Sequence, residues 1–147
     1  NKGVNDLDRI RSGVKVANIM SAVYAVIIYV VLLPVLPYAI RLFVTEDISL
    51  VYGYARTYIL ICGAFFIPLG MIFIFRNALQ GCGFGFMPMM GGVVELISRS
   101  AAAFVAAYFL SYEGICFANA LAWLTAGVFL WIAYRILFKR MVREKQA

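Results

Sequence analysis

The two residues best suited to chemistry are Glu95 and Arg99, which interrupt the otherwise apolar stretch from Phe86 to Leu110. Their spacing of four places both side chains on one helix face, with the glutamate N-terminal to the arginine, the more favourable order. A charge at the centre of a bilayer costs at least about 2.5–3.5 kcal/mol, so we expect both side chains to face the interior of a helix bundle. Either the pair is self-neutralised and holds one helix to another, or Glu95 binds a proton or a cation while Arg99 adjusts that affinity.

Other kinds of chemistry find little support in the sequence. The chain has no histidine, which removes histidine general bases and histidine metal ligands. Cys62, Cys82 and Cys116 lie far apart in apolar stretches without a C-x-x-C spacing, which predicts buried free thiols. The glycines of Gly81–Gly85 lack the G-x-G-x-x-G nucleotide spacing and predict a tight connection between helices. We therefore predict no catalytic residues, no metal site and no enzyme activity.

The composition shows which kind of element must position the charged pair. The chain has 147 residues, of which 65% are hydrophobic and 14% charged, and its mean hydropathy is +0.92. An average soluble domain has about 25% charged and 45–50% apolar residues. This composition excludes an ordinary soluble domain and a disordered chain, and it predicts a membrane protein.

Long apolar runs predict four membrane-spanning helices. Val16–Ile40 has 25 uncharged residues, and at 1.5 Å per residue such a helix is roughly 37 Å long, enough to cross a bilayer with some tilt. Thr57–Phe75 and Gly114–Tyr134 are uncharged runs of 19 and 21 residues, and the stretch around Glu95 supplies the remaining span. The predicted fold is an all-α, polytopic membrane helix bundle with helices over approximately 12–44, 48–79, 86–111 and 114–140. Between the first two, Thr45-Glu46-Asp47 reads as an acidic turn in which Asp47 caps the next helix.

The distribution of lysine and arginine predicts the orientation. With four crossings, the N-terminal segment, the turn after the second span and the C-terminal tail lie on one side of the membrane. They hold ten basic residues, against two near the opposite turns: Lys2, Arg9, Arg11, Lys15, Arg76, Arg135, Lys139, Arg140, Arg143 and Lys145, against Arg41 and Arg56. Because basic residues are retained in the cytoplasm, we predict a multi-pass protein of the plasma (inner) membrane with both termini cytoplasmic. The net charge of +6 is thus a topology signal, and we predict no nucleic-acid partner.

Prolines and polar residues inside the spans are candidates for a hinge or a cavity. Pro34 in the first span and Pro68 in the second each remove a helix hydrogen bond, which indicates either a bent packing helix or a hinge. Asn77, Gln80 and Asn119 are suited equally to a transport cavity and to interhelical hydrogen bonds.

Small residues characterise one face of the third span. Gly91, Gly92, Ser98 and Ala101–Ala103 favour close packing between helices, because small side chains let helix backbones approach in lipid. A substrate-lining role is the alternative.

Four motifs in order resemble the last four helices of the MATE (multidrug and toxic compound extrusion) family. Residues 1–11, Asn-Lys-Gly followed by Asp-Arg-Ile-Arg, resemble the family's Q-N-x-G-A motif and its basic sequel, although Val4 replaces the usual alanine. Residues 76–83 resemble its R-x-x-L-Q-G-x-G turn, and residues 92–99 the G-x-x-E-L-x-x-R of one bacterial branch. Residues 114–119 are similar to that branch's final helix, so the resemblance covers essentially the whole chain.

The resemblance implies a twelve-helix secondary transporter with two six-helix lobes that alternates between inward- and outward-open states. Residues 1–147 would be a C-terminal fragment, part of the second lobe. The partners implied are the lipid bilayer, amphipathic cationic small molecules, the N-terminal lobe and the first helices of the C-terminal lobe. The family exports organic cations in exchange for Na⁺ or H⁺, without another cofactor. Some members carry a coupling Asp in the tenth helix, whereas Thr57–Phe75 has no acid, so coupling would rest on Glu95, on helices outside this sequence, or on both.

Three other functions compete with ion-coupled export. A lipid-linked oligosaccharide flippase of related fold needs a cationic cavity, for which Arg99 alone is thin support. A membrane-embedded enzyme needs a nucleophile and base or a metal set, which the spans lack. A non-transporting structural subunit would use Glu95 and Arg99 only to hold helices together.

Overall fold

The computed structural model describes residues 1–44 and 48–146, which form α-helices joined by short connections. In chain order these helices are α1 (Leu7–Phe43), α2 (Ile48–Gly63), α3 (Phe66–Gly81), α4 (Phe86–Tyr108) and α5 (Tyr112–Gln146). The described residues contain no strand, which confirms the predicted all-α class. The predicted turn Thr45-Glu46-Asp47, with its cap at Asp47, lies outside these residues.

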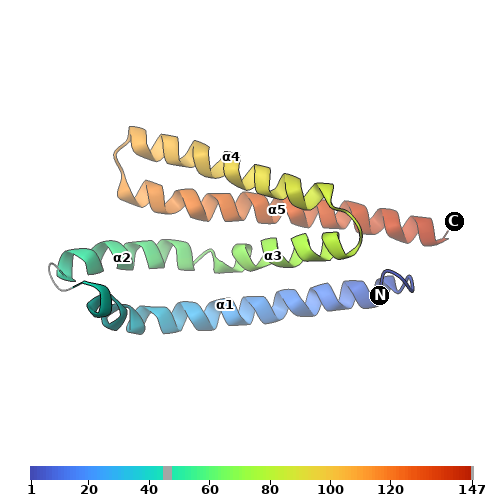
Figure 1. The fold of residues 1–147 in the computed structure, drawn as a ribbon, viewed down its shortest axis with the longest axis horizontal. Helices are drawn as coiled ribbons and strands as arrows, with labels where there is room; N and C mark the ends of the chain where they lie inside the picture. Colours follow the sequence, from blue (N-terminus) through green and yellow to red (C-terminus); the bar gives the residue numbers. More distant parts are fainter. Residues whose placement is uncertain (45–47, 147) are drawn as a thin grey trace.

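Three of the helices, α1, α4 and α5, are each long and apolar enough to cross a bilayer. Helices α2 and α3 pass the same test as a pair, bent by 50° at the break between them. Figure 1 shows this pair running in one overall direction beside α1, which is the path of one broken span. Counted in this way, the described residues contain the four candidate spans of the predicted membrane helix bundle.

The break between α2 and α3 corrects the expectation of one continuous helix over 48–79. In a continuous helix the ring of Pro68 would clash with the carbonyl of Ala64, and Pro68 has no N–H to donate to that carbonyl. The backbone avoids both problems by ending α2 at Gly63 and starting α3 at Phe66. Pro68 is then the third residue of α3, where no intrahelical donor is needed. The sequence analysis expected the distortion of the helix at Pro68, whereas the helix breaks just before that residue.

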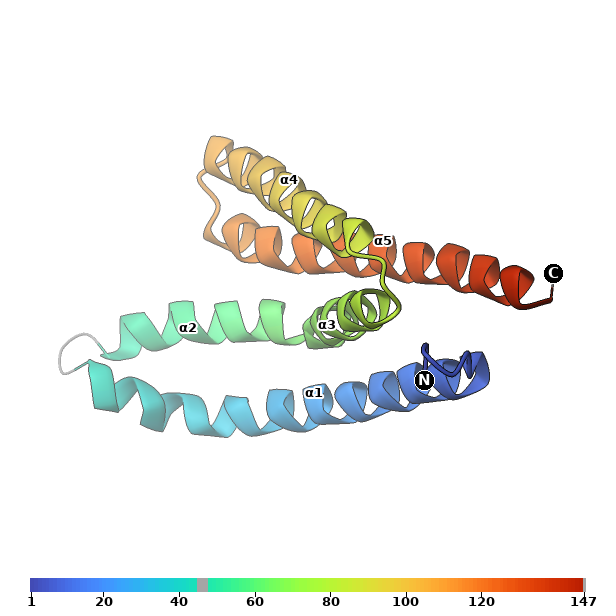
Figure 2. The same cartoon turned by 45° about the vertical axis from the view of Figure 1, so that its right-hand side comes forward.

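Helix α1 packs against the bundle at this break. The Tyr29 hydroxyl donates a hydrogen bond to the carbonyl of Leu60 at 3.3 Å, and Gly63 lies directly against the Tyr29 ring. Helix α1 itself continues without interruption through Pro34 and Pro37. Figure 2 shows α1 curving over this C-terminal part.

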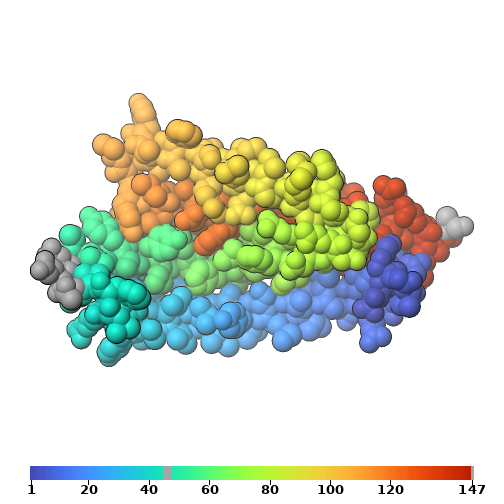
Figure 3. Space-filling model, viewed as in Figure 1, coloured from blue at the N-terminus to red at the C-terminus, as the bar shows by residue number. Residues whose placement is uncertain are grey.

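Helix α5 is the most buried span and the centre of the packing. Figures 1 and 2 both show the order α4, α5, α2–α3 and α1, and the space-filling view in Figure 3 shows α1 along one edge. The main core lies between α3 and α5 and consists of Ile72, Phe75, Leu79, Ala126, Leu130, Ala133 and Tyr134. Alanines at 118, 120, 122 and 126 of α5 are 0–3% exposed, so neighbouring helices approach its backbone closely.

The predicted glycine connection between the second and third spans contains a specific helix-terminating turn. Gly83 adopts a left-handed φ of 90°, its amide donates to the carbonyl of Gln80 at 2.9 Å, and the amide of Phe84 donates to the carbonyl of Leu79 at 2.9 Å. These are the two hydrogen bonds of a Schellman motif, which places a glycine just past the helix end. Gly83 is therefore the conformationally required glycine of this connection.

This geometry predicts opposite outcomes for two neighbouring glycines. Gly83→Ala should lower the free energy of unfolding by roughly 1 kcal/mol, because a Cβ is strained in the left-handed region. Gly81→Ala should leave it unchanged or raise it slightly, since Gly81 is the last residue of α3 and has open space around it. Thermal unfolding of the purified variants in detergent measures the difference, and equal effects at both positions would contradict this assignment.

The connection from α4 to α5 explains why α4 ends, and α5 begins, earlier than predicted. Leu110 has a φ of 48°, and the amide of Ser111 donates to the carbonyl of Ala106 at 3.1 Å, so α4 ends at Tyr108 instead of 111. The Ser111 hydroxyl then accepts a hydrogen bond from the amide of Gly114 at 3.1 Å. This N-cap starts α5 at Tyr112 instead of 114.

The outer ends of α1 and α5 extend beyond the apolar runs. Asp6 accepts a hydrogen bond from the amide of Arg9 at 3.0 Å, which caps α1 and moves its start from 12 to Leu7. At the other end, Arg140 pairs with Glu144 one turn later at 2.8 Å, and α5 continues past 140 to Gln146. Figure 1 shows both chain ends at the same end of the bundle.

Candidate functional site

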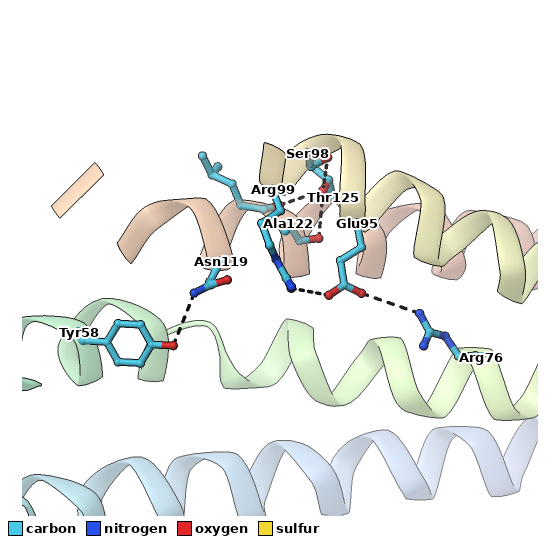
Figure 4. A network of polar contacts seen from close by, with 9 residues as sticks. Tyr58, Arg76, Glu95, Ser98, Arg99, Asn119, Ala122 and Thr125 are labelled. Atoms are coloured by element: carbon cyan, nitrogen blue, oxygen red, sulfur yellow. Dashed lines mark hydrogen bonds and ion pairs between the residues drawn. The ribbon is translucent and has the colours of Figure 1, made fainter. Parts of the chain in front are cut away.

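The structure brings three charged side chains together between α3 and α4, namely Arg76, Glu95 and Arg99 (Figure 4). Nη2 of Arg99 lies 2.6 Å from Oε1 of Glu95, and Nη2 of Arg76 lies 3.8 Å from Oε2 of the same carboxylate. Glu95 is the most enclosed of the three, with 22% of its side chain exposed against 30% for Arg76 and 43% for Arg99. We refer to these residues as the Glu95 cluster.

The local helix geometry positions each member of the cluster. Glu95 and Arg99 are one turn apart on α4, as their spacing predicted, and their side chains meet. Arg76 reaches across from α3. Gly92 of α4 lies opposite Arg76, and a Cβ built on it would be 3.9 Å from Nη2 of Arg76, an ordinary contact distance.

Arg76 is the site residue that the sequence analysis missed. It closes the uncharged run Thr57–Phe75 and was therefore assigned to the turn after the second span. The structure places it inside α3, before the helix ends at Gly81, with its guanidinium directed at Glu95. The available signal was the predicted helix over 48–79, which already included Arg76. Without Arg76, the membrane side that holds the chain termini still has nine basic residues, against two on the opposite side. The charge asymmetry therefore persists.

The cluster carries one excess positive charge, because two guanidinium groups share one carboxylate. Each oxygen of Glu95 faces one guanidinium. Within the described residues, the Nε atoms of Arg76 and Arg99 are buried and have no hydrogen-bond partner. A cation or proton that reaches Glu95 must therefore compete with both arginines.

Two further hydrogen bonds connect helices near the cluster. Thr125 of α5 donates to Ser98 of α4 at 2.9 Å, and Asn119 of α5 donates to Tyr58 of α2 at 3.5 Å (Figure 4). Asn119 thus makes an interhelical contact, one of the two roles considered for it.

The other polar and proline candidates are not members of the Glu95 cluster. Asn77 and Gln80 are exposed on α3, and neither makes a side-chain hydrogen bond within the described part of the chain. Pro34 is exposed on α1, and Pro68 lies in the first turn of α3. The structure therefore brings the charged candidates together, and no side-chain hydrogen bond within the described residues joins Asn77 or Gln80 to them.

The three cysteines belong to the packed interior. Cys62, Cys82 and Cys116 are free and buried, and Sγ of Cys62 lies 3.6 Å from the carbonyl oxygen of Cys116. Residues 1–44 and 48–146 contain no group of three or more His, Cys, Asp or Glu side chains that could hold a metal ion.

Paired charges inside a bundle of apolar spanning helices define a class of protein. Because an ionisable side chain is costly at membrane depth, such groups face the bundle interior, pair with one another and mark transport pathways. The fold and the Glu95 cluster are those of a multi-pass membrane helix bundle with ionisable groups between its candidate spanning helices.

The comparison with family models identifies the family. The model described as MatE matches residues 1–105, which is most of the chain and includes all three members of the Glu95 cluster, so the chain belongs to the MatE family. It is a membrane transporter of the MATE type, as the resemblance of its motifs predicted. Searches of curated proteins and of solved structures found no match.

Proposed function

We propose that this transporter exports organic cations and related amphipathic compounds across the plasma membrane in exchange for Na⁺ or H⁺, with Glu95 as the coupling residue. The position of Glu95 supports this proposal. Its carboxylate lies on a spanning helix and pairs with one arginine from α3 and one from α4. An ion bound to the Glu95 carboxylate would change the contact between α3 and α4. Replacing Glu95 by glutamine tests the proposal, as described in the Discussion.

Ion binding at Glu95 would alter the contact through charge. When a proton or Na⁺ neutralises the carboxylate, the guanidinium groups of Arg76 and Arg99 lose their shared partner and repel each other. Helix α3 is separated from α2 by a bent break, so it can shift relative to α4 without breaking a continuous helix. The two arrangements, paired and separated, are the kind of two-state element that a bound ion can bias.

The same charges explain why the ion and a cationic substrate would exchange. The cluster has a net charge of +1 when Glu95 is ionised, and an added cation raises it to +2. A positively charged substrate nearby is therefore disfavoured while the coupling ion is bound. Mutual exclusion of this kind is what an antiporter requires.

We also propose that both chain ends are cytoplasmic, because the basic residues concentrate at that end of the bundle. A cysteine at Glu113, which is exposed at the opposite end, should react with a membrane-impermeant maleimide in intact cells. A cysteine at Lys145 should react only after permeabilisation. The native thiols are buried, and burial raises the pKa of the Cys82 thiol, which slows its alkylation and keeps the background low. The reverse labelling pattern would show the opposite orientation.

A lipid-linked oligosaccharide flippase is the second candidate function. The observation that favours it is the excess positive charge of the cluster together with the unpartnered Nε atoms of Arg76 and Arg99, which suit a phosphate group. A flippase of this kind would depend on both arginines and would work without a Na⁺ or H⁺ gradient. Transport that persists after both gradients are collapsed would favour it over antiport.

A further inference from the structure

A groove of about 1050 Å³ lies between α1, α3 and α5, toward the end of the bundle that holds both chain termini. It is distinct from the Glu95 cluster, because none of the cluster residues lines it. Its inner wall is apolar, with Ile19 from α1 and Ile67 and Met71 from α3. We refer to it as the terminal groove.

The outer wall of the terminal groove is strongly basic. Arg11 and Lys15 are one turn apart on α1, and Arg135, Lys139 and Arg143 are spaced by single turns on α5. Each set therefore lies along one face of its helix, and the two faces meet at the groove. None of the described lining residues is acidic.

No described acidic residue of this end lines the groove, and Asp8 in the first turn of α1 is also outside the lining. Glu144 pairs with Arg140, and neither lines the groove. Asp6 is the cap of α1 and accepts the amide of Arg9. Five positive charges thus line the groove, and no carboxylate is among its described lining residues.

Polar groups at the inner end of this basic wall also lack partners. The Tyr134 hydroxyl is buried without a hydrogen-bond partner in the described chain, and Tyr134 lines the groove. The guanidinium of Arg135 stacks on the ring of Trp131 at 4.6 Å from the ring centre, so its edge stays available to an acceptor. A ligand with anionic oxygens would offer acceptors to the exposed guanidinium of Arg135.

We propose that the terminal groove binds an anionic phospholipid from the membrane leaflet at this end of the bundle. Its phosphate would lie among the five basic side chains, and part of an acyl chain would lie along Ile19, Ile67 and Met71. Basic pockets between spanning helices are suited to anionic headgroups. A cationic ligand would be repelled, and a small free anion would leave the apolar inner wall uncovered.

Trp131 offers a direct probe, because it lines the groove and the chain has only one other tryptophan. The full chain with Trp123→Phe is placed in phosphatidylcholine vesicles that contain either brominated phosphatidylglycerol or brominated phosphatidylcholine, whose acyl chains quench nearby tryptophan. We expect the brominated phosphatidylglycerol to quench Trp131 at a roughly tenfold lower mole fraction. Equal quenching by the two lipids would overturn the proposal.

Two double variants on the same helix separate the groove from general surface charge. Lys139→Gln/Arg143→Gln removes two groove cations and should reduce the preference to roughly twofold or less. Arg140→Gln/Lys145→Gln removes two cations outside the groove and should keep the preference within about twofold of the parent. Equal losses in both doubles would overturn the proposal. Loss of the preference on adding millimolar inorganic phosphate would instead assign the groove to a free anion.

Discussion

Glu95→Gln is expected to abolish ion-driven export while the protein still inserts into the membrane. The amide has nearly the same shape but no negative charge, so it cannot bind the coupling ion or neutralise Arg99 at 2.6 Å and Arg76 at 3.8 Å. A lost charge-assisted contact corresponds to roughly 1.5–3 kcal/mol, about a tenfold to hundredfold reduction even before the loss of ion binding is counted. Export of a fluorescent organic cation from cells, normalised to the amount of protein in the membrane, measures the effect.

Glu113→Gln is the matched control, because it removes a carboxylate that is exposed at the start of α5. It should leave export unchanged. Repeating the measurement with the Na⁺ gradient and then the H⁺ gradient collapsed identifies the coupling ion. Normal export by Glu95→Gln would exclude a coupling role and leave the Glu95 cluster as a structural contact between α3 and α4.

Gly91→Ala is expected to destabilise the packing of α4 on α5. A Cβ built on Gly91 would lie 2.8 Å from Cδ2 and 2.9 Å from Cγ of Leu130, which is fully buried and cannot move aside easily. Overpacking of this kind lowers the free energy of unfolding by about 1–3 kcal/mol. Larger side chains at position 91 should separate the two helices further.

The neighbouring glycine provides the control. A Cβ on Gly92 would meet only Nη2 of Arg76, at the ordinary contact distance of 3.9 Å, so Gly92→Ala should leave stability nearly unchanged. The loss of monomeric protein on heating in detergent, followed by size-exclusion chromatography, compares the two variants. If Gly92→Ala were the more harmful substitution, the small face of α4 would have a role other than packing against α5.

The spans and the Glu95–Arg99 contact could be predicted because each depends on local sequence. An uncharged run of about 20 residues is sufficient to identify a spanning helix. A separation of four residues on one helix is sufficient to bring Glu95 and Arg99 together. The small residues of α4 likewise predicted close packing, and the contact between Gly91 and Leu130 shows that the partner helix is α5.

The remaining features depend on contacts between helices or on backbone geometry. Arg76 ends an uncharged run in the sequence, and only the approach of α3 to α4 turns it toward Glu95. The break before Pro68 could have been predicted from the proline's clash with the residue four positions earlier, but hydropathy continues smoothly across it. Leu110 carries no sequence signal for a left-handed conformation, because glycine is the residue expected there.

The division of the Glu95 cluster between neighbouring helices has a consequence for biosynthesis. Glu95 and Arg99 emerge from the ribosome on the same helix, so they can enter the lipid already paired. Arg76 emerges earlier, on α3, and has no acidic partner on its own helix. The arrival of α4 therefore supplies the counter-charge that Arg76 lacks on its own helix.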